Sequence, residues 1–282
     1  MRNLKCRDKI STKNQARLSF LGQSQVLLLL LFWGPMVIGQ TAPEILQKTI
    51  ASIDTIETLH YKQKMFRSNP QNLNDTIRRH REMYFKRLAT DSIVGVKGHW
   101  YMYVHDTIHV IYEDIYDGQR LLRVNHKDKM VRIFDLQKYP AFRQKHFWSH
   151  NTWYGMQFEF KYMLRHQELY TIKRRPDTTV NGRECYVVSV VLQDKMGMPG
   201  FALQLQDQAG RVSENRYFID KEGLYPIRVQ GQFYSKGSLE QIVFIDQTYV
   251  DIHLNPILDE NTRFNTETTD LYGYEAIEMR PE

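Results

Sequence analysis

The fold is decided by residues 98–135, which read GHWYMYVHDTIHVIYEDIYDGQRLLRVNHKDKMVRIFD. Runs of β-branched and aromatic residues alternate here with short turn sequences, namely Asp106-Thr107, Asp117-Gly118 and Lys127-Asp128. Such runs, each bounded by turn residues, predict strands at 98–105, 108–116, 119–125 and 130–135. Because connections this short join antiparallel neighbours, the stretch predicts an antiparallel meander.

The same pattern continues on both sides of this meander. Further strands are predicted near 57–67, 78–88, 169–174, 184–192, 211–220, 225–234 and 239–248. Pro43 and the three-to-four spacing of the apolar residues after it predict a helix over 43–54. The aromatic-rich segment 140–168 lacks alternation and predicts one or two short helices, and another short helix is expected after Asn255. We therefore expect an α+β, mainly β domain of about ten or eleven antiparallel strands.

Charge is distributed unevenly along the chain. The net charge is +6 over 282 residues, but residues 1–25 contain six basic residues against the single acid Asp8. The rest of the chain is nearly neutral and offers no excess of positive charge for phosphates, so nucleic acid is not an expected partner. With 42% apolar and 12% aromatic residues, this remainder has enough apolar surface to bury a sizeable core.

The basic stretch leads into an apolar run from Val26 to Gly39. A basic region, a short apolar region and a small residue before a polar one are typical of a secretory signal peptide. We expect residues 1–39 to be removed and residues 40–282 to form one domain in the periplasm. The alternative is an uncleaved inner-membrane anchor, but the apolar run is shorter than the roughly 20 residues needed to span a bilayer.

Only one cysteine, Cys185, follows the expected cleavage site, since Cys6 lies before it. An intramolecular disulfide, a redox pair and a cysteine zinc site are therefore excluded in the mature chain. Cys185 begins a run rich in β-branched residues, and no neighbouring basic cluster would generate a thiolate. The sequence predicts a buried thiol in a strand.

Large flexible or aromatic side chains recur at the predicted inner positions of the strands. Met adapts its shape and aromatic rings offer flat apolar walls, which suits a cavity for a hydrophobic ligand. We expect segment 140–168 to form a lid over this cavity. The candidate ligand-binding residues of wall and lid are Met65, Met83, Phe85, Trp100, Met102, Trp148, Trp153, Phe158 and Tyr162. The alternative is that these residues simply fill a core.

Three stretches of the chain resemble a known family. They are 116–135, with its Tyr116-Asp117-Gly118 turn, 180–188, which reads VNGRECYVV, and 217–227, which reads YFIDKEGLYPI. In this order they are similar to the LolA/LppX-like superfamily of periplasmic lipoprotein carriers and outer-membrane lipoprotein-sorting proteins. The resemblance implies an incomplete antiparallel β-barrel whose concave face is covered by helices and holds acyl chains.

Other candidate sites are weaker. His105 and His109 have a metal-binding spacing only when helical, and here they flank a predicted hairpin turn. Glu113, Asp114 and Asp117 could imitate a catalytic carboxylate pair, although a solvated strand end explains them. The basic run at 78–81 alternates and so points to both faces of a strand. We predict no catalytic residue, no metal site and no cofactor.

These observations favour a non-enzymatic carrier or binding module for lipid, acyl chains or lipoprotein. The alternative is an envelope interaction or assembly protein with the same fold and a filled core, which would have an envelope protein as its partner. A third reading is a hydrolase that uses the acidic cluster near Asp114. We expect a monomer.

Overall fold

The structure is a computed structural model. It describes residues 39–69, 72–91, 95–104, 109–142, 152–192, 211–235, 241–267 and 271–281. Sequence predictions that fall outside these residues concern the leader up to residue 38, His105 and the stretch 143–151 with Trp148. The boundary between leader and domain also stays a prediction.

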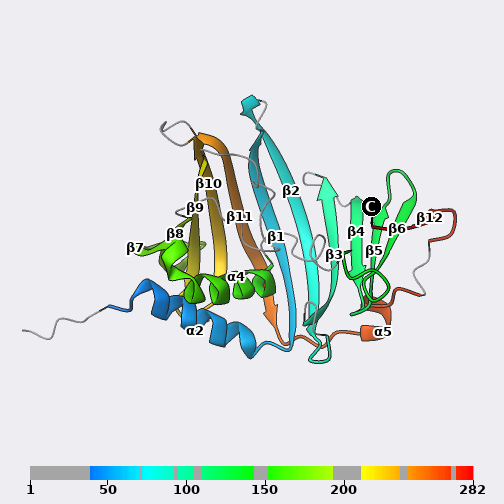
Figure 1. The fold of residues 1–282 in the computed structure, drawn as a ribbon, viewed down its shortest axis with the longest axis horizontal. Helices are drawn as coiled ribbons and strands as arrows, with labels where there is room; N and C mark the ends of the chain where they lie inside the picture. The colour runs from blue at the N-terminus through cyan, green and yellow to red at the C-terminus, as the bar shows by residue number, and fades with distance from the viewer. Residues whose placement is uncertain are drawn as a thin grey trace, which may run out of the picture. The chain divides into compact units, whose positions relative to one another are not determined.

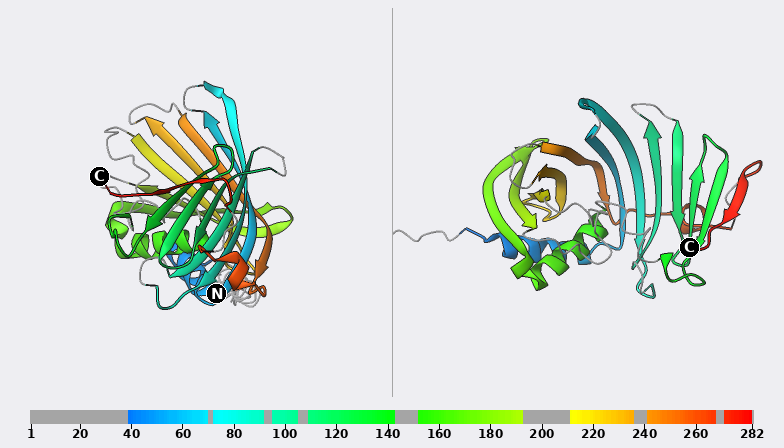
Figure 2. Two further views of the ribbon diagram at one scale, coloured as in Figure 1. Left: turned by 90° about the vertical axis from the view of Figure 1, so that its right-hand side faces the viewer. Right: turned by 45° about the horizontal axis from the view of Figure 1, so that its top comes forward.

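Twelve strands of the described residues form a single curved sheet (Figures 1 and 2). They are β1 (Thr58–Asn69), β2 (Asn72–Arg87), β3 (Val96–Val104), β4 (Val110–Tyr116), β5 (Arg120–Asn125), β6 (Met130–Asp135), β7 (Tyr170–Val180), β8 (Arg183–Leu192), β9 (Arg211–Asp220), β10 (Pro226–Ser235), β11 (Gln241–Leu254) and β12 (Glu275–Glu278). Their order across the sheet is β12-β6-β5-β4-β3-β2-β1-β11-β10-β9-β8-β7. Because β12 and β7 are unpaired edges, the barrel is incomplete, as the sequence predicted.

The sheet consists of two meanders joined through β1 and β11. β1 pairs with β2 on one side and with β11, from the far end of the chain, on the other. All neighbouring strands are antiparallel except β12 and β6, which are parallel. The β1–β11 pairing therefore brings the first and last long strands of the domain side by side.

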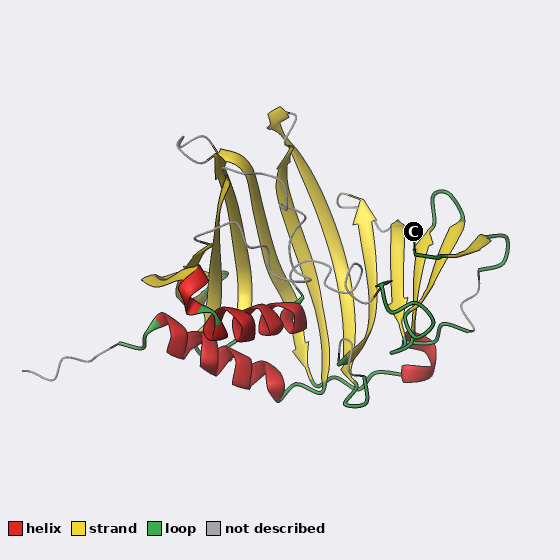
Figure 3. Ribbon diagram, in the orientation of Figure 1, coloured by secondary structure: helices red, strands yellow, loops and turns green. Residues whose placement is uncertain are grey.

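The helices gather at one end of the strands (Figure 3). They are α2 (Ala42–Asp54), α4 (Trp153–Arg165), the one-turn 3-10 helix η1 (Gln167–Leu169) and α5 (Glu260–Arg263). A capping box begins α2, because Thr41 Oγ1 accepts a hydrogen bond from the Glu44 amide and Glu44 Oε2 accepts one from the Thr41 amide. Thr152 caps α4 in a similar way through the amide of Gly155, at 3.0 Å. Polar caps thus start both long helices, and α2 begins within one residue of its predicted start at Pro43.

Several strands differ from the prediction: β2 begins at Asn72 rather than near 78, β11 ends at Leu254 rather than near 248, and β7 and β12 also differ. β7 was expected to end at 174 but continues past Pro176, because a register shift between Arg175 and Thr178 accommodates the proline on this edge strand. β12 was not predicted, since its sequence EAIE has only one large apolar residue. It forms because the edge of β6 is available for pairing and because Leu271 and Tyr274, which precede it, pack on a small apolar cluster.

A tight turn ends β7. Asn181 and Gly182 have φ angles of 50° and 79°, which is the left-handed region that a two-residue hairpin turn requires. Glycine tolerates this conformation, and asparagine adopts it more readily than most residues.

The main hydrophobic core lies between the sheet and the two long helices. It includes the apolar face of α2, the aromatic residues of α4 and facing strand residues such as Tyr61, Met83 and Tyr217. None of the helices in the described part of the chain is long and apolar enough to cross a lipid bilayer.

Cys185 is buried in β8, as the sequence predicted. Burial, together with the nearby carboxylate of Asp220, raises the pKa of the Cys185 thiol to about 11. In a Cys6→Ser variant, we expect Cys185 at pH 8 to react with a chromogenic disulfide reagent roughly 100-fold more slowly when folded than in denaturant. Absorbance measures the release of the reagent's thiolate. Equal rates in the folded and denatured protein would show that the thiol is accessible and ionised.

Candidate functional site

Alternation along the strands assigns each side chain to one of two sheet faces. The rings of Tyr61 on β1 and Phe85 on β2 lie 5.6 Å from those of Trp153 and Tyr154 on α4, respectively. We call this helix-contacting side the inner face and the opposite side the outer face. The strand register also places on the inner face Gln63, Met65, Arg79, Arg81, Met83, Trp100, Met102, Tyr112 and Asp114.

The part of the inner face next to α4 is filled with side chains. Trp153 is fully buried and stacks on Tyr225, with ring centroids 4.5 Å apart. The rings of Phe85 and Trp100 also stack, at 6.3 Å, and Met83 is buried in the same core. Four of the predicted ligand-binding residues, Met83, Phe85, Trp100 and Trp153, are therefore brought together in packed core.

The other predicted ligand-binding residues lie in different surroundings. Met65 and Met102 are half-buried on the inner face, farther along β1 and β3. Phe158 is 41% exposed on α4, while Tyr162 is half-buried one turn later. Trp148 lies outside the described residues.

An apolar strip leads from the core toward solvent. Met102 pairs across β3 and β4 with Tyr112, which is 39% exposed. Trp100 and Met83 continue the strip into the buried core. Sequence reasoning did not include Tyr112 among the binding residues, although its alternation with Glu113 was the signal that could have found it.

Arg81 lies beside this strip on β2. It pairs in register with Gln63 on β1 and Met102 on β3. Its Nε atom is buried and has no hydrogen-bond partner among the described residues. Burial, and to a smaller extent the charge of Arg79, lowers the pKa of this guanidinium. The predicted alternation of residues 78–81 is confirmed, but Arg81 is half-buried rather than solvated.

Asp114 is the acidic neighbour on the inner face, and its oxygens are already occupied. Arg123 donates from Nε to Oδ1 and from Nη2 to Oδ2, both at 2.9 Å. Trp100 Nε1 donates to Oδ2 at 3.1 Å. Asp114 is therefore neutralised by Arg123.

The predicted acidic cluster is divided between the two faces of β4. Glu113 lies on the outer face, with its carboxylate oxygens 2.6 Å from His99 Nε2 and 3.0 Å from His126 Nε2. Asp117 accepts hydrogen bonds from backbone amides of the turn that follows β4. Because Glu113 and Asp114 point to opposite faces, they do not form a pair of catalytic carboxylates.

A buried carboxyl group lies on α4. Glu159 Oε2 accepts a hydrogen bond of 3.2 Å from the hydroxyl of Tyr217 on β9. Burial raises the pKa of Glu159 to about 7, and this hydrogen bond only partly opposes the shift. Glu159 therefore titrates near neutral pH. The only sequence signal for this buried carboxyl group is an acidic residue within an aromatic helix.

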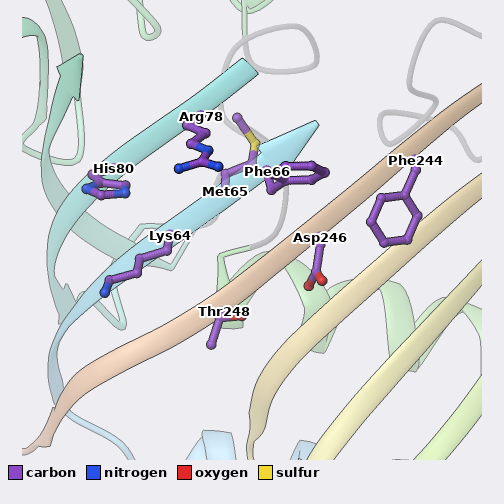
Figure 4. Close-up of a pocket in the computed structure, with 8 residues that line it drawn as sticks. All are labelled: Lys64, Met65, Phe66, Arg78, His80, Phe244, Asp246 and Thr248. Carbon is purple, nitrogen blue, oxygen red and sulfur yellow. The ribbon is translucent and has the colours of Figure 1, made fainter. Parts of the chain in front are cut away.

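The outer face has a groove of its own, with a volume of about 370 Å³ (Figure 4). It is lined by residues of β1, β2 and β11, namely Lys64, Phe66, Arg78, His80, Phe244, Asp246 and Thr248, together with Met65, whose position in the register belongs to the inner face. Asp246 accepts a hydrogen bond of 2.8 Å at Oδ1 from Arg228 Nε. The groove is thus basic on the β2 side and aromatic toward the start of β11.

No protein-family model and no curated protein matches this chain. Several solved structures match it. The lipoprotein LppX of Mycobacterium tuberculosis has a TM-score of 0.45 at 6% identity, over 77% of this chain and 97% of that one. A putative outer membrane lipoprotein-sorting protein domain from Vibrio parahaemolyticus has a TM-score of 0.35 at 15% identity, over 78% and 94%.

A LolA superfamily protein from Nitrosomonas europaea has a TM-score of 0.33 at 8% identity, over 80% of this chain and 98% of that one. The last of these structures bears the name of the superfamily that the sequence resembles. At these identities and TM-scores the likeness carries no argument about function, which rests on the inner face itself.

Proposed function

We propose that this protein is a periplasmic, non-enzymatic carrier or binding module for a lipid, an acyl chain or a lipoprotein. The observation that supports the proposal is the apolar strip of the inner face, which runs from buried Met83 and Trp100 to the half-exposed pair Met102 and Tyr112. An acyl chain on this strip gains about 0.8 kcal/mol for each buried CH₂ group. Tyr112 is 39% exposed among the described residues, so this end of the strip is open to solvent there.

The ligand would lie along the strip and not beneath α4, because Trp153, Met156 and Phe160 fill that space. This position differs from the one that the sequence suggested, in which segment 140–168 covers a cavity. A strip that is open on one side gives moderate affinity, and a carrier that must release its ligand needs moderate affinity.

The filled core next to α4 also favours a second candidate function. An envelope interaction or assembly protein needs no internal cavity, and the core next to α4 is filled. In this case an envelope protein would bind where the first proposal places an acyl chain.

Ligand binding distinguishes the two candidates. We expect native mass spectrometry of protein purified from the periplasm to show bound lipid, and we expect added lipid to displace a fluorescent fatty acid. Protein that is empty in every preparation and does not bind the fluorescent fatty acid would exclude the carrier function.

Replacing Met102 by glutamine tests the place of binding. We expect affinity for the fluorescent fatty acid to fall about fivefold, since about 1 kcal/mol of apolar contact is lost. Met130→Gln is the matched control, because Met130 is half-buried in the same cross-strand row but three strands away, on β6. Fluorescence titration measures both variants, and equal losses would place the ligand elsewhere.

A further inference from the structure

Arg81 forms no ion pair with another of the described residues. No hydrogen bond or ion pair joins it to another residue in the part of the chain that the structure describes, and its Nε is buried. Taking a guanidinium group out of water is costly unless an anion accompanies it. The two inner-face residues that flank Arg81 in register, Gln63 and Met102, carry no charge.

The surrounding charges leave the inner face positive. Arg79 lies on the same face two residues earlier and adds to the positive charge near Arg81. Asp114 attracts Arg81 but is bound by Arg123 and Trp100. Glu159 is farther away on α4, where it accepts its hydrogen bond from Tyr217. Among the described residues, an external anion would therefore find two guanidinium groups and no free carboxylate beside them.

The neighbours of Arg81 indicate what kind of anion fits. Met102 lies directly opposite on β3, and Trp100 and Met83 continue the apolar strip from there. A guanidinium group binds carboxylate and phosphate oxygens through two parallel hydrogen bonds. A ligand with an anionic head and an apolar chain would thus match both Arg81 and the strip.

We propose that Arg81, with Arg79 beside it, binds the carboxylate or phosphate head group of an anionic amphiphile whose chain lies on the apolar strip. This assignment rests on the proposed carrier function and narrows its ligand to an anionic class. Arg81 acts by binding and positioning the head group, while Met102 and Tyr112 contact the chain.

Three ligands with the same chain test the proposal, namely laurate, dodecyl phosphate and dodecanol. Each displaces a neutral fluorescent lipid probe from the delipidated protein near neutral pH. We expect the anions to bind at least about tenfold more tightly than the alcohol, consistent with a charge-assisted pair of hydrogen bonds. The ratio between laurate and dodecyl phosphate distinguishes a carboxylate from a phosphate head group.

In Arg81→Gln we expect the preference for the anions to disappear while dodecanol binds as before. Arg78→Gln is the matched control, because Arg78 is on the same strand but on the outer face. The control should keep the full preference. Retention of the preference in Arg81→Gln would overturn the role of Arg81.

A thermal melt of the delipidated protein shows whether a variant that loses binding is still folded. Because Arg81 has no hydrogen-bond or ion-pair partner among the residues that the structure describes, we expect Arg81→Met to melt at the wild-type temperature or above it. A large decrease in both Arg81 variants would show a structural role and overturn the proposal. Equal binding of all three ligands to the wild-type protein would also overturn it but leave the carrier function standing, whereas no binding at all would exclude the carrier function.

Discussion

Replacing Trp153 by alanine is expected to destabilise the protein by about 3–5 kcal/mol. Trp153 is 0% exposed, and its ring lies 4.5 Å from that of Tyr225, 5.6 Å from Tyr61 and 6.3 Å from Tyr249. It therefore joins α4 to β1, to β11 and to the turn that precedes β10, and its removal leaves a cavity in the core. Urea denaturation followed by far-UV circular dichroism measures the loss.

Phe158→Ala is the control for Trp153→Ala. Phe158 lies on the same helix but is 41% exposed, so we expect a change within about 0.5 kcal/mol. The pair also tests the prediction that both residues contact ligand. If Phe158→Ala weakens ligand binding without changing stability, the exposed side of α4 takes part in the site. A small effect of Trp153→Ala on stability would contradict the filled core described here.

Glu159 is expected to make stability depend on pH. Burial raises its pKa to about 7 from the ordinary value of 4.5, so the folded protein binds this proton more tightly than the unfolded chain does. The stabilising contribution is complete below about pH 4.5 and is lost as the pH rises through about 7. The total is about 3 kcal/mol.

Glu159→Gln should remove this dependence, because glutamine keeps the shape of the protonated acid. At pH 8 we expect the variant to be more stable than wild type by up to about 3 kcal/mol, and near pH 5 about equal to it. Urea midpoints at the two pH values measure the difference. Other groups, such as His60 on the outer face, titrate in both proteins, so their contributions to stability cancel when the variant is compared with wild type.

Glu168→Gln is the control for this experiment, since Glu168 is exposed in η1 just after α4 and is 3.4 Å from His166. Its urea midpoint should follow the wild-type pH profile. A constant difference between wild type and Glu159→Gln at both pH values would show that Glu159 is already ionised in the folded protein at pH 5.

Local patterns predicted most of the secondary structure. The strands of 98–135 and the helix at 43–54 are found close to their predicted places, because alternation, helical spacing and turn residues act over a few neighbouring positions. β12 escaped prediction because its four residues carry little pattern and depend on the edge of β6. The register of β1 with β11 was equally unpredictable, since it joins distant parts of the chain.

The candidate site was predicted only in part. Alternation correctly assigned Arg78 and Arg81 to opposite faces, and it grouped Met102 with Met83 and Trp100. Which of these side chains would be covered depended on where α4 packs. Met83 lies in the buried core that α4 shares with the sheet, whereas Met102 lies beyond it and is half-buried.

The sequence by itself determined the strands, their turns and the face to which each side chain points, because these follow from neighbouring residues. Only the tertiary structure decided that Arg81 has a buried Nε without a hydrogen-bond partner among the described residues and that Glu159 is buried. Burial and charge pairing depend on side chains that distant elements bring together. A pattern along the chain therefore predicts the direction in which a side chain points, but not whether it is exposed to solvent or paired with an opposite charge.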